Sequence, residues 1–485
     1  MTASSSRWWL LALLLLAATL RLLQLSYESI WLDEALTWVQ VNGSYAAMME
    51  SVRQDVHPPV YFHVLQFFVW LGGDSEFMLR FPSALFGVLT VWVTYLCGKR
   101  LDFGRAALVP ALLVAVSMFH IRYSQEARMY TLMAFLTGWS MLTLLNLRRR
   151  EAGLGAMLHY LLATILLMYT HIYGMFAVMA QSLYVIPLAV LTKQPPIPLK
   201  RWLLLQVIVA VSFLPWVGTL LSQVDRVSRG FWIGEPGIAD FFATFSLYSG
   251  GITAAVLTAL LASLAVRKLT DKKHGESLPE TFGNEWFLLC WLLTPILVPF
   301  VISQFTQPIF YGRYTIAASL AWYLLVGAGL SVAWQQPRWR PVLLLLTAVV
   351  VVWPAGKGLR YFTEDMKPDW RGVVAYVEER AEPGDLVIFH NLNIIEPYRY
   401  YAARDDLKLH KLIPGRDAFV PDFAAAEAVN FDELTAPHNQ VWIVLAYTRG
   451  WEFDVEDFPE LMAGFELQPI EPLTRRVIVQ RYIRQ

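Results

Sequence analysis

The chain has 485 residues, of which 56% are hydrophobic and only 16% are charged, and its mean hydropathy is positive. Soluble domains are nearer a quarter charged, so this composition excludes an ordinary soluble protein and predicts a polytopic α-helical membrane protein. The formal net charge is zero and no segment is typical of a nucleic-acid-binding surface, so we expect no nucleic-acid partner.

Charge is distributed unevenly between the two parts of the chain. Residues 1–356 carry 24 Lys and Arg against 17 Asp and Glu, a net charge of +7, whereas residues 357–485 carry 15 against 22, a net charge of −7. The apolar segments stop at the same point. We therefore predict a transmembrane domain over 1–356 and an acidic soluble α/β domain over 357–485.

Apolar segments long enough to cross a bilayer recur along the first domain. They lie at approximately 8–25, 81–97, 106–119, 129–147, 155–170, 173–191, 202–221, 240–266, 285–303, 314–334 and 341–355. We expect about 11 transmembrane helices, the first of them an uncleaved anchor. The first two are separated by a long loop over 26–80, in which the apolar run 60–71 is too short to span and is expected to lie along the membrane interface.

The distribution of basic residues predicts the orientation of these helices. If the N-terminus is cytoplasmic, the cytoplasmic ends of the spans hold 16 basic residues and the opposite ends hold seven. The loop 26–80 and the C-terminal domain are then extracytoplasmic, in a multi-pass protein of the inner (plasma) membrane.

The C-terminal domain has a mixed helix and strand pattern. A helix is expected over 369–381, and strands over 385–390, 441–447 and 474–482. Further helices are expected over 422–429 and 457–464. No Gly-rich phosphate loop is present in the sequence, so three roles stay open for this domain: binding an acceptor, gating access, or stabilising the loops of the membrane domain.

Two adjacent carboxylates follow directly on the first apolar segment, in the stretch YESIWLDEALT at 27–37. Ionised groups at the edge of an apolar span are costly unless they face water or a protein cavity, so Asp33 and Glu34 are candidate catalytic residues. The alternative is that they only mark the water-exposed end of a helix.

Further polar and aromatic residues gather at the same predicted face, in HPP (57–59), RFP (80–82), HIRYSQEARMY (120–130), YTHIYG (169–174) and FYGRY (310–314). Arginine presents a planar fork that suits phosphate, and a carboxylate can act on an incoming nucleophile. The pattern therefore predicts a site for a lipid phosphate. Candidate donor or phosphate ligands are Arg80, Arg122, Tyr123, Arg128, Arg313 and Tyr314, and candidate pocket residues are His57, Gln125, Glu126, Tyr130 and His171.

Each of these residues also has a structural interpretation. An external arginine can pair with lipid headgroups or with Glu126, and the tyrosines fit an interfacial aromatic belt. His57 can be a turn residue, His171 a hydrogen-bonded core histidine, and Gln125 a polar residue at a helix start. Their joint occurrence on one side of the membrane favours the functional interpretation.

Four ordered motifs resemble a known superfamily: SIWLDEALT (29–37), VHPPVYF (56–62), DSEFMLRFPSALFGVLTVWVTYLCGKRLDFGRAA (74–107) and FHIRYSQEARMY (119–130). They are similar to the N-terminal half of bacterial membrane glycosyltransferases of the GT-C superfamily. The similarity is greatest to the branch that contains the protein O-mannosyltransferases and the aminoarabinose lipid A transferase. It is close over roughly 8–180, and FYGRY extends it to about 355.

The resemblance implies a GT-C fold, a polyprenyl-phosphate-linked sugar donor, an active site at the external membrane face and no nucleotide cofactor. It maps the catalytic carboxylate onto Asp33, with Glu34 beside it, and the HPP of the mannosyltransferases onto His57, Pro58 and Pro59. The aminoarabinose enzymes have a different residue before the prolines, so the donor and acceptor contacts stay open. Some relatives hold a divalent cation and others need none, so a metal requirement is also open.

The resulting hypothesis is sugar transfer by direct displacement. Asp33 would act as general base, or would orient the acceptor if that is already anionic, and Glu34 would be its partner or would bind the donor sugar. Arg128, Arg313 and Arg122 would hold the polyprenyl phosphate. The acceptor, whether protein, lipid or glycan, is not predicted. The alternatives are a lipid or sugar transporter, a non-catalytic scaffold that presents the C-terminal domain, and an en bloc oligosaccharide transferase.

Overall fold

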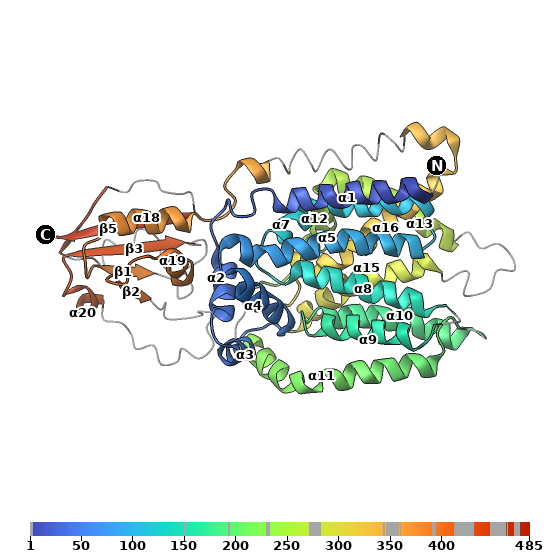
Figure 1. Cartoon of the computed structure of the whole chain (residues 1–485), viewed down its shortest axis with the longest axis horizontal. Coiled ribbons are helices and arrows are strands. Elements are labelled where there is room, and N and C mark those ends of the chain that lie inside the picture. The colour runs from blue at the N-terminus through green and yellow to red at the C-terminus, as the bar shows by residue number, and fades with distance from the viewer. Residues whose placement is uncertain are drawn as a thin grey trace.

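The chain forms a bundle of helices with a small α/β domain at one end, and its N-terminus lies at the far end of the bundle (Figure 1). This computed structural model describes residues 3–149, 152–192, 195–228, 233–270, 283–342, 345, 358, 360–389, 394–411, 431–446, 462, 464–469 and 476–485. The predicted boundary between the two domains, at 356/357, lies outside these residues.

The helices of the bundle follow one another with short connections. Their bounds are α1 Ala3–Leu22, α2 Leu32–Val41, α3 Tyr45–Gln54, α4 Val60–Gly72, α5 Glu76–Arg100, η1 Gly104–Ala107, α6 Leu108–Val116, α7 Met118–Ser124, α8 Tyr130–Leu147, α9 Leu154–Met168, α10 Gly174–Leu191, α11 Leu199–Ser228, α12 Ile238–Ser249, α13 Ile252–Thr270, α15 Asn284–Phe305, η2 Gly312–Thr315, α16 Ile316–Trp334 and η3 Pro337–Trp339.

These helices confirm a polytopic membrane protein but not the number of 11 spans. Six described helices are long and apolar enough to cross a membrane, or up to eight if each of two bent pairs counts as one span. The predicted span at 341–355 lies almost entirely outside the described residues. Apolar side chains that a soluble protein would bury stay exposed along α11, as expected for contact with lipid: Leu203, Leu204, Val207, Val211, Leu214 and Leu221.

Two of the predicted spans are broken. The pair η1/α6 and α7 bends by 57°, and the pair α12 and α13 bends by 85°. The first break falls at Ser117, whose backbone is extended at φ −64° and ψ 118°. The second falls at Gly250 and Gly251, whose φ angles are 77° and 142°. Residues other than glycine rarely adopt a backbone conformation with such positive φ angles. After the first bend, the loop 125–129, between α7 and α8, turns toward the loop 26–80, where the backbone N–H of Ala127 donates to Glu34.

The long loop over 26–80 forms a layer of three helices, α2, α3 and α4, at the end of the bundle that faces the C-terminal domain (Figure 1). The start of α2 is stabilised by Glu34, whose Oε2 accepts the backbone N–H of Trp31 at 3.4 Å. The start of α3 is capped by Ser44, which accepts the N–H of Ala47 at 3.3 Å. The apolar run predicted at 60–71 is the helix α4.

The C-terminal domain is built on a mixed five-stranded sheet of order β2-β1-β3-β5-β4. Strand β1 pairs in parallel with β2 and β3, and β5 pairs antiparallel with β3 and β4. The bounds are α18 Trp370–Arg380, β1 Leu386–Phe389, α19 Ile395–Tyr401, β2 Lys408–Lys411, α20 Phe431–Thr435, β3 Gln440–Ala446, β4 Phe465–Leu467 and β5 Val477–Arg484. The helix and the three strands expected from sequence are confirmed, whereas the helices expected at 422–429 and 457–464 lie outside the described residues.

The sheet separates two apolar layers because side chains alternate along its central strands. On one face Val387 and Trp442 pack against Trp370 and Val374 of α18. On the other face Ile388 and its neighbours in β3 form a second cluster. Burial on both faces explains why β1 and β3 are continuous apolar runs in the sequence.

Candidate active site

A carboxylate and two guanidinium groups meet at the end of the bundle that faces the C-terminal domain. Asp33 lies in the first turn of α2, and its Oδ2 is 3.2 Å from Nη1 of Arg313 in η2. From the loop 125–129, Nη1 of Arg128 donates to the backbone carbonyl of Asp33 at 3.3 Å and to Oγ1 of Thr37 at 3.0 Å. The Asp33 side chain is 20% exposed, although its Oδ2, the oxygen beside Arg313, is buried.

Tyrosine rings form a wall around Arg313. The centre of its guanidinium lies 5.6, 5.1 and 5.7 Å from the ring centroids of Tyr130, Tyr311 and Tyr314. At these distances the rings attract the cation and keep its planar group in place. The ring of Tyr123 packs edge-on against Tyr130 at 5.0 Å. Tyr123, Tyr130 and Tyr314 are buried, so they line the site and are not an interfacial belt.

Two histidines lie against this wall. The rings of His57 and His171 are 5.1 Å apart, and His171 is 5.2 Å from the ring of Tyr314. Burial, together with the positive charges of Arg128 and Arg313, holds the pKa of His57 well below its ordinary value, and the pKa of His171 is lowered in the same way. Both imidazoles are therefore neutral at pH 7 and can accept a hydrogen bond.

Several polar atoms of this site lack a hydrogen-bond partner among the described residues. They are Nδ1 of His57, Nε of Arg128, Oη of Tyr130 and Nε2 of His171. Buried polar atoms are ordinarily paired, so a group of unpaired ones around a carboxylate fits a ligand rich in hydroxyl and phosphate oxygens.

Glu34, the neighbour of Asp33, has a different environment. Its side chain is fully buried, and its two carboxylate oxygens accept from Nε and Nη2 of Arg80, both at 2.8 Å. They also accept from the backbone N–H of Ala127 at 2.9 Å and from Nζ of Lys367 at 3.0 Å. Burial by itself would raise the pKa of Glu34, but Arg80 and Lys367 outweigh it and lower the pKa to about 2.

Glu34 therefore stays ionised and presents no free oxygen to a substrate. The prediction that Glu34 takes part in the chemistry, as the partner of Asp33 or as a ligand of the donor sugar, stays a prediction, whereas its contacts in the structure are those of a residue that positions its neighbours. Its ion pair with Arg80 holds α2 against α5, and its bond to Ala127 holds the loop that carries Arg128. Asp33 and Arg128 are thus aligned through their neighbours in the chain.

Arg80 is likewise not placed to bind a phosphate. Besides its two bonds to Glu34, its Nη1 donates to the carbonyls of Leu25 and Glu28 at 2.9 and 2.8 Å, and its Nη2 donates to the carbonyl of Ser29 at 2.9 Å. Only 1% of the residue is exposed. Its donors are therefore used to fold the chain between α1 and α2.

Three further candidates lie to the side of the site. Arg122, whose side chain is 53% exposed, pairs with Oε1 of Glu126 at 3.3 Å, which is the alternative that its spacing allowed. Burial raises the pKa of Glu126, although Lys367 and Arg122 oppose this. Gln125 donates to the carbonyls of Arg21 and Leu23 at 3.1 and 2.8 Å, so it fixes the end of α1.

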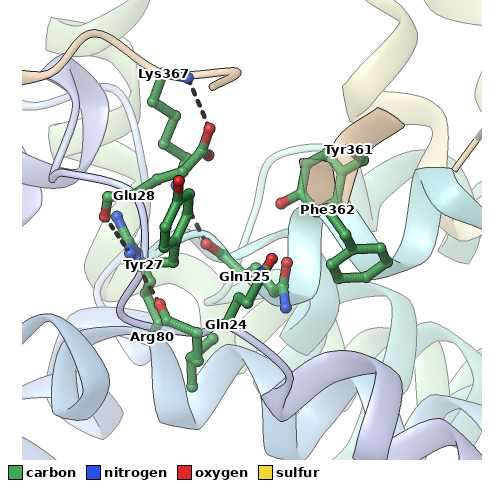
Figure 2. A pocket seen from close by; sticks show the side chains of 9 residues that line it. Gln24, Tyr27, Glu28, Arg80, Gln125, Tyr361, Phe362 and Lys367 are labelled. Atoms are coloured by element: carbon green, nitrogen blue, oxygen red, sulfur yellow. Dashed lines mark hydrogen bonds between the residues drawn. The ribbon is translucent and has the colours of Figure 1, made fainter. Parts of the chain in front are cut away.

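Two functional neighbours were missed by the sequence reasoning. Thr37 lies one helical turn after Asp33, and this spacing was a usable signal. Lys367 reaches Glu34 from 333 positions away, so no local pattern indicates it. Figure 2 shows Lys367 beside Glu28 and Arg80, at a small pocket of about 20 Å³ that Gln125 and Tyr361 also line.

The described residues do not form a metal site. Nowhere in the described ranges do three or more His, Cys, Asp or Glu side chains come together as a metal ion requires. The guanidinium cation of Arg313 lies beside the Asp33 carboxylate, and its positive charge would repel a divalent cation bound there.

The comparisons with known proteins give a fold for the whole chain. Residues 56–217 match the family described as dolichyl-phosphate-mannose-protein mannosyltransferase. No curated protein matches the sequence. The structure is similar to ArnT from Cupriavidus metallidurans bound to undecaprenyl phosphate, with a TM-score of 0.66 at 14% identity over 99% of this chain and 98% of that chain. The chain has the GT-C fold. This agrees with the resemblance of its N-terminal motifs.

Other GT-C structures are similar over most of this chain. The archaeal oligosaccharyltransferase AglB from Archaeoglobus fulgidus, in complex with an inhibitory peptide and a dolichol-phosphate, has a TM-score of 0.54 at 14% identity, over 90% of this chain and 69% of that chain. The arabinofuranosyltransferase AftD from Mycobacteria has a TM-score of 0.55 at 14% identity, over 99% of this chain and 41% of that chain. The similarity to ArnT covers nearly the full length of both chains, so it also includes the C-terminal domain of this chain.

Proposed function

We propose that this GT-C chain is a glycosyltransferase that moves a sugar from a polyprenyl-phosphate donor to an acceptor at the extracytoplasmic face of the membrane. The observation that carries the proposal is the position of the partly exposed Asp33, whose carboxylate lies beside the guanidinium group of Arg313 and whose backbone carbonyl accepts from Arg128. ArnT bound to undecaprenyl phosphate and AglB bound to a dolichol-phosphate support a lipid phosphate as the donor group.

In this reaction Asp33 takes the proton from an O–H or N–H group of the acceptor. The acceptor atom attacks the anomeric carbon of the sugar while the bond from that carbon to the phosphate oxygen breaks. The electron pair leaves with the polyprenyl phosphate, and Arg128 and Arg313 stabilise the negative charge that develops on it. General-base catalysis contributes about 10²–10⁴-fold in rate, and fixed cations at a developing charge contribute several kcal/mol.

The extracytoplasmic location is supported by two observations. Basic residues favour the N-terminal end of the bundle as cytoplasmic. The helix α2, which carries Asp33, lies at the opposite end, beside the C-terminal domain (Figure 1). In this orientation a lipid-linked sugar in the outer leaflet can enter the site from the membrane while the acceptor approaches from outside.

The test is to incubate the purified protein in lipid nanodiscs with a panel of polyprenyl-phosphate sugars, each together with protein, lipid and glycan acceptors, and to measure release of polyprenyl phosphate. We expect one donor to be consumed by the wild type and Asp33→Asn to lower the rate by about 10²-fold or more. Near-normal transfer by Asp33→Asn would refute the role of Asp33. Movement of the lipid across vesicles without consumption of any donor would instead identify a transporter.

A further inference from the structure

The chain that enters the C-terminal domain is bound to the active-site end of the bundle. The carboxylate of Glu28 accepts the backbone N–H groups of Met366 and Lys367, the latter at 3.0 Å. The ammonium group of Lys367 then reaches inward to Glu34 at 3.0 Å and to the carbonyl of Gln125 at 3.3 Å. Its side chain is only 10% exposed.

The first helix of the C-terminal domain adds two contacts. At the start of α18, Oδ1 of Asp369 accepts from the hydroxyl of Ser29 at 3.0 Å. Two residues further, Nη2 of Arg371 lies 2.6 and 2.8 Å from the two carboxylate oxygens of Glu76, at the start of α5. One guanidinium nitrogen therefore contacts both oxygens of the carboxylate and ties the start of α18 to the start of α5.

The helix α19 contacts the same region from the other side. The hydroxyl of Tyr401 accepts the backbone N–H of Ile30 at 2.7 Å and donates to Glu76. The neighbouring Tyr400 donates its hydroxyl to the carbonyl of Asp74 at 2.8 Å. We call residues 366–371 and 400–401 the clamp.

The contacts of the clamp fall on residues close to Asp33 in the chain. Two of them, Ser29 and Ile30, lead into α2, and Glu34 is the next residue after Asp33. The clamp therefore contacts both the residues that precede α2 and, through Glu34, the first turn of α2 itself. A C-terminal domain that merely sat on the membrane surface would not need to place a buried cation on the carboxylate of Glu34, the residue next to Asp33.

We propose that the C-terminal domain is a working part of the active site and that Lys367 is a positioning residue, which holds Asp33 in register with Arg128. This inference rests on the proposed transferase function. Lys367 and Ala127 bind the same carboxylate, that of Glu34, so the ammonium group helps to fix α2 relative to the loop that carries Arg128. A displacement of about 1 Å between reacting groups costs about 10²-fold in rate.

The first test replaces Lys367 by Met, which keeps an unbranched side chain, one atom shorter, and removes the charge. The matched control is Lys411→Met, because Lys411 also pairs with a carboxylate of the same domain, that of Glu396 at 3.2 Å, and neither residue contacts Glu34 or belongs to the clamp. We expect Lys367→Met to lower kcat for sugar transfer at least tenfold with KM for the donor within about twofold, Lys367→Arg to recover most of kcat, and the control to match the wild type.

A second pair of variants tests the clamp without altering a charge. Tyr401→Phe removes the hydroxyl that binds Ile30 and Glu76, whereas Tyr398→Phe removes a buried hydroxyl that has no hydrogen-bond partner among the described residues. We expect kcat to fall severalfold in Tyr401→Phe and to stay unchanged in Tyr398→Phe. If both pairs of variants transfer sugar at the wild-type kcat, the positioning role is wrong although the transferase function stands. An inactive wild type would instead overturn the proposed function itself.

Discussion

Replacement of Glu34 by Gln tests the arrangement that holds the site together. Glutamine has the shape of glutamate but no charge, so the variant leaves two cations, Arg80 and Lys367, without their counter-ion. The side chains of these cations are only 2% and 10% exposed, so water cannot replace the carboxylate.

The expected loss follows from two separate estimates. Removing one partner of a buried ion pair costs about 3–5 kcal/mol, because an uncompensated buried charge is left behind. The pKa of Glu34, lowered from its ordinary value of 4.5 to about 2, corresponds to about 3 kcal/mol of interaction that favours the ionised form. We therefore expect Glu34→Gln to lower the free energy of unfolding by about 3 kcal/mol at pH 7.

The assay is unfolding by SDS titration in mixed micelles, followed by circular dichroism. The matched control is Glu50→Gln, because Glu50 pairs with Arg53 on the surface of α3, where the side chains are 62% and 56% exposed. Such a pair contributes at most about 1 kcal/mol. If Glu34→Gln is no more destabilising than this control, the buried network does not hold α2 in place and the positioning role of Glu34 is wrong.

The remaining predictions concern pH and the donor site. The folded-state pKa of Glu34 lies below its ordinary value, so the ionised carboxylate stabilises the fold fully above about pH 5, and this stabilisation is lost as the pH falls toward 2. The difference in unfolding free energy between wild type and Glu34→Gln should therefore become smaller from pH 5 to pH 2. A difference that stays constant over this range would contradict the lowered pKa of Glu34. Arg313→Gln should raise KM for the polyprenyl-phosphate donor about tenfold or more and change KM for the acceptor little. The control is Arg149→Gln, which should change neither KM, because Arg149 is exposed at the other end of the bundle. If Arg313→Gln raises KM for the acceptor more than KM for the donor, the donor phosphate binds elsewhere.

Much of the candidate site was predictable because each chemical group carries its own local signal. Asp33 and Glu34 follow an apolar segment directly, and the arginines of HIRYSQEARMY and FYGRY break the basic bias of the loops. These signals indicated that polar residues from distant segments share one membrane face. The structure brings Asp33, Arg128 and Arg313 together there, with the tyrosines and histidines around them.

Sequence alone did not separate residues of the same type. Asp33 and Glu34 are adjacent acids, yet one is accessible and the other is enclosed by Arg80, Lys367 and a backbone N–H. Arg80 and Arg313 both stand beside an aromatic residue in motifs predicted at the same membrane face. Of the two, only Arg313 lies beside the carboxylate of Asp33, whereas Arg80 pairs with Glu34. The difference depends on partners that are far apart in the chain, which local patterns do not encode.

What the sequence determined by itself is the class of the molecule. Composition, the lengths of the apolar segments and the reversal of net charge near residue 356 specify a membrane domain and an acidic α/β domain, because these properties sum over many residues and do not depend on contacts. Only the tertiary structure decided how the two domains work together. The buried bond from Lys367 to Glu34 depends on both domains being folded, because desolvation and pairing of charges arise only once the chain is packed.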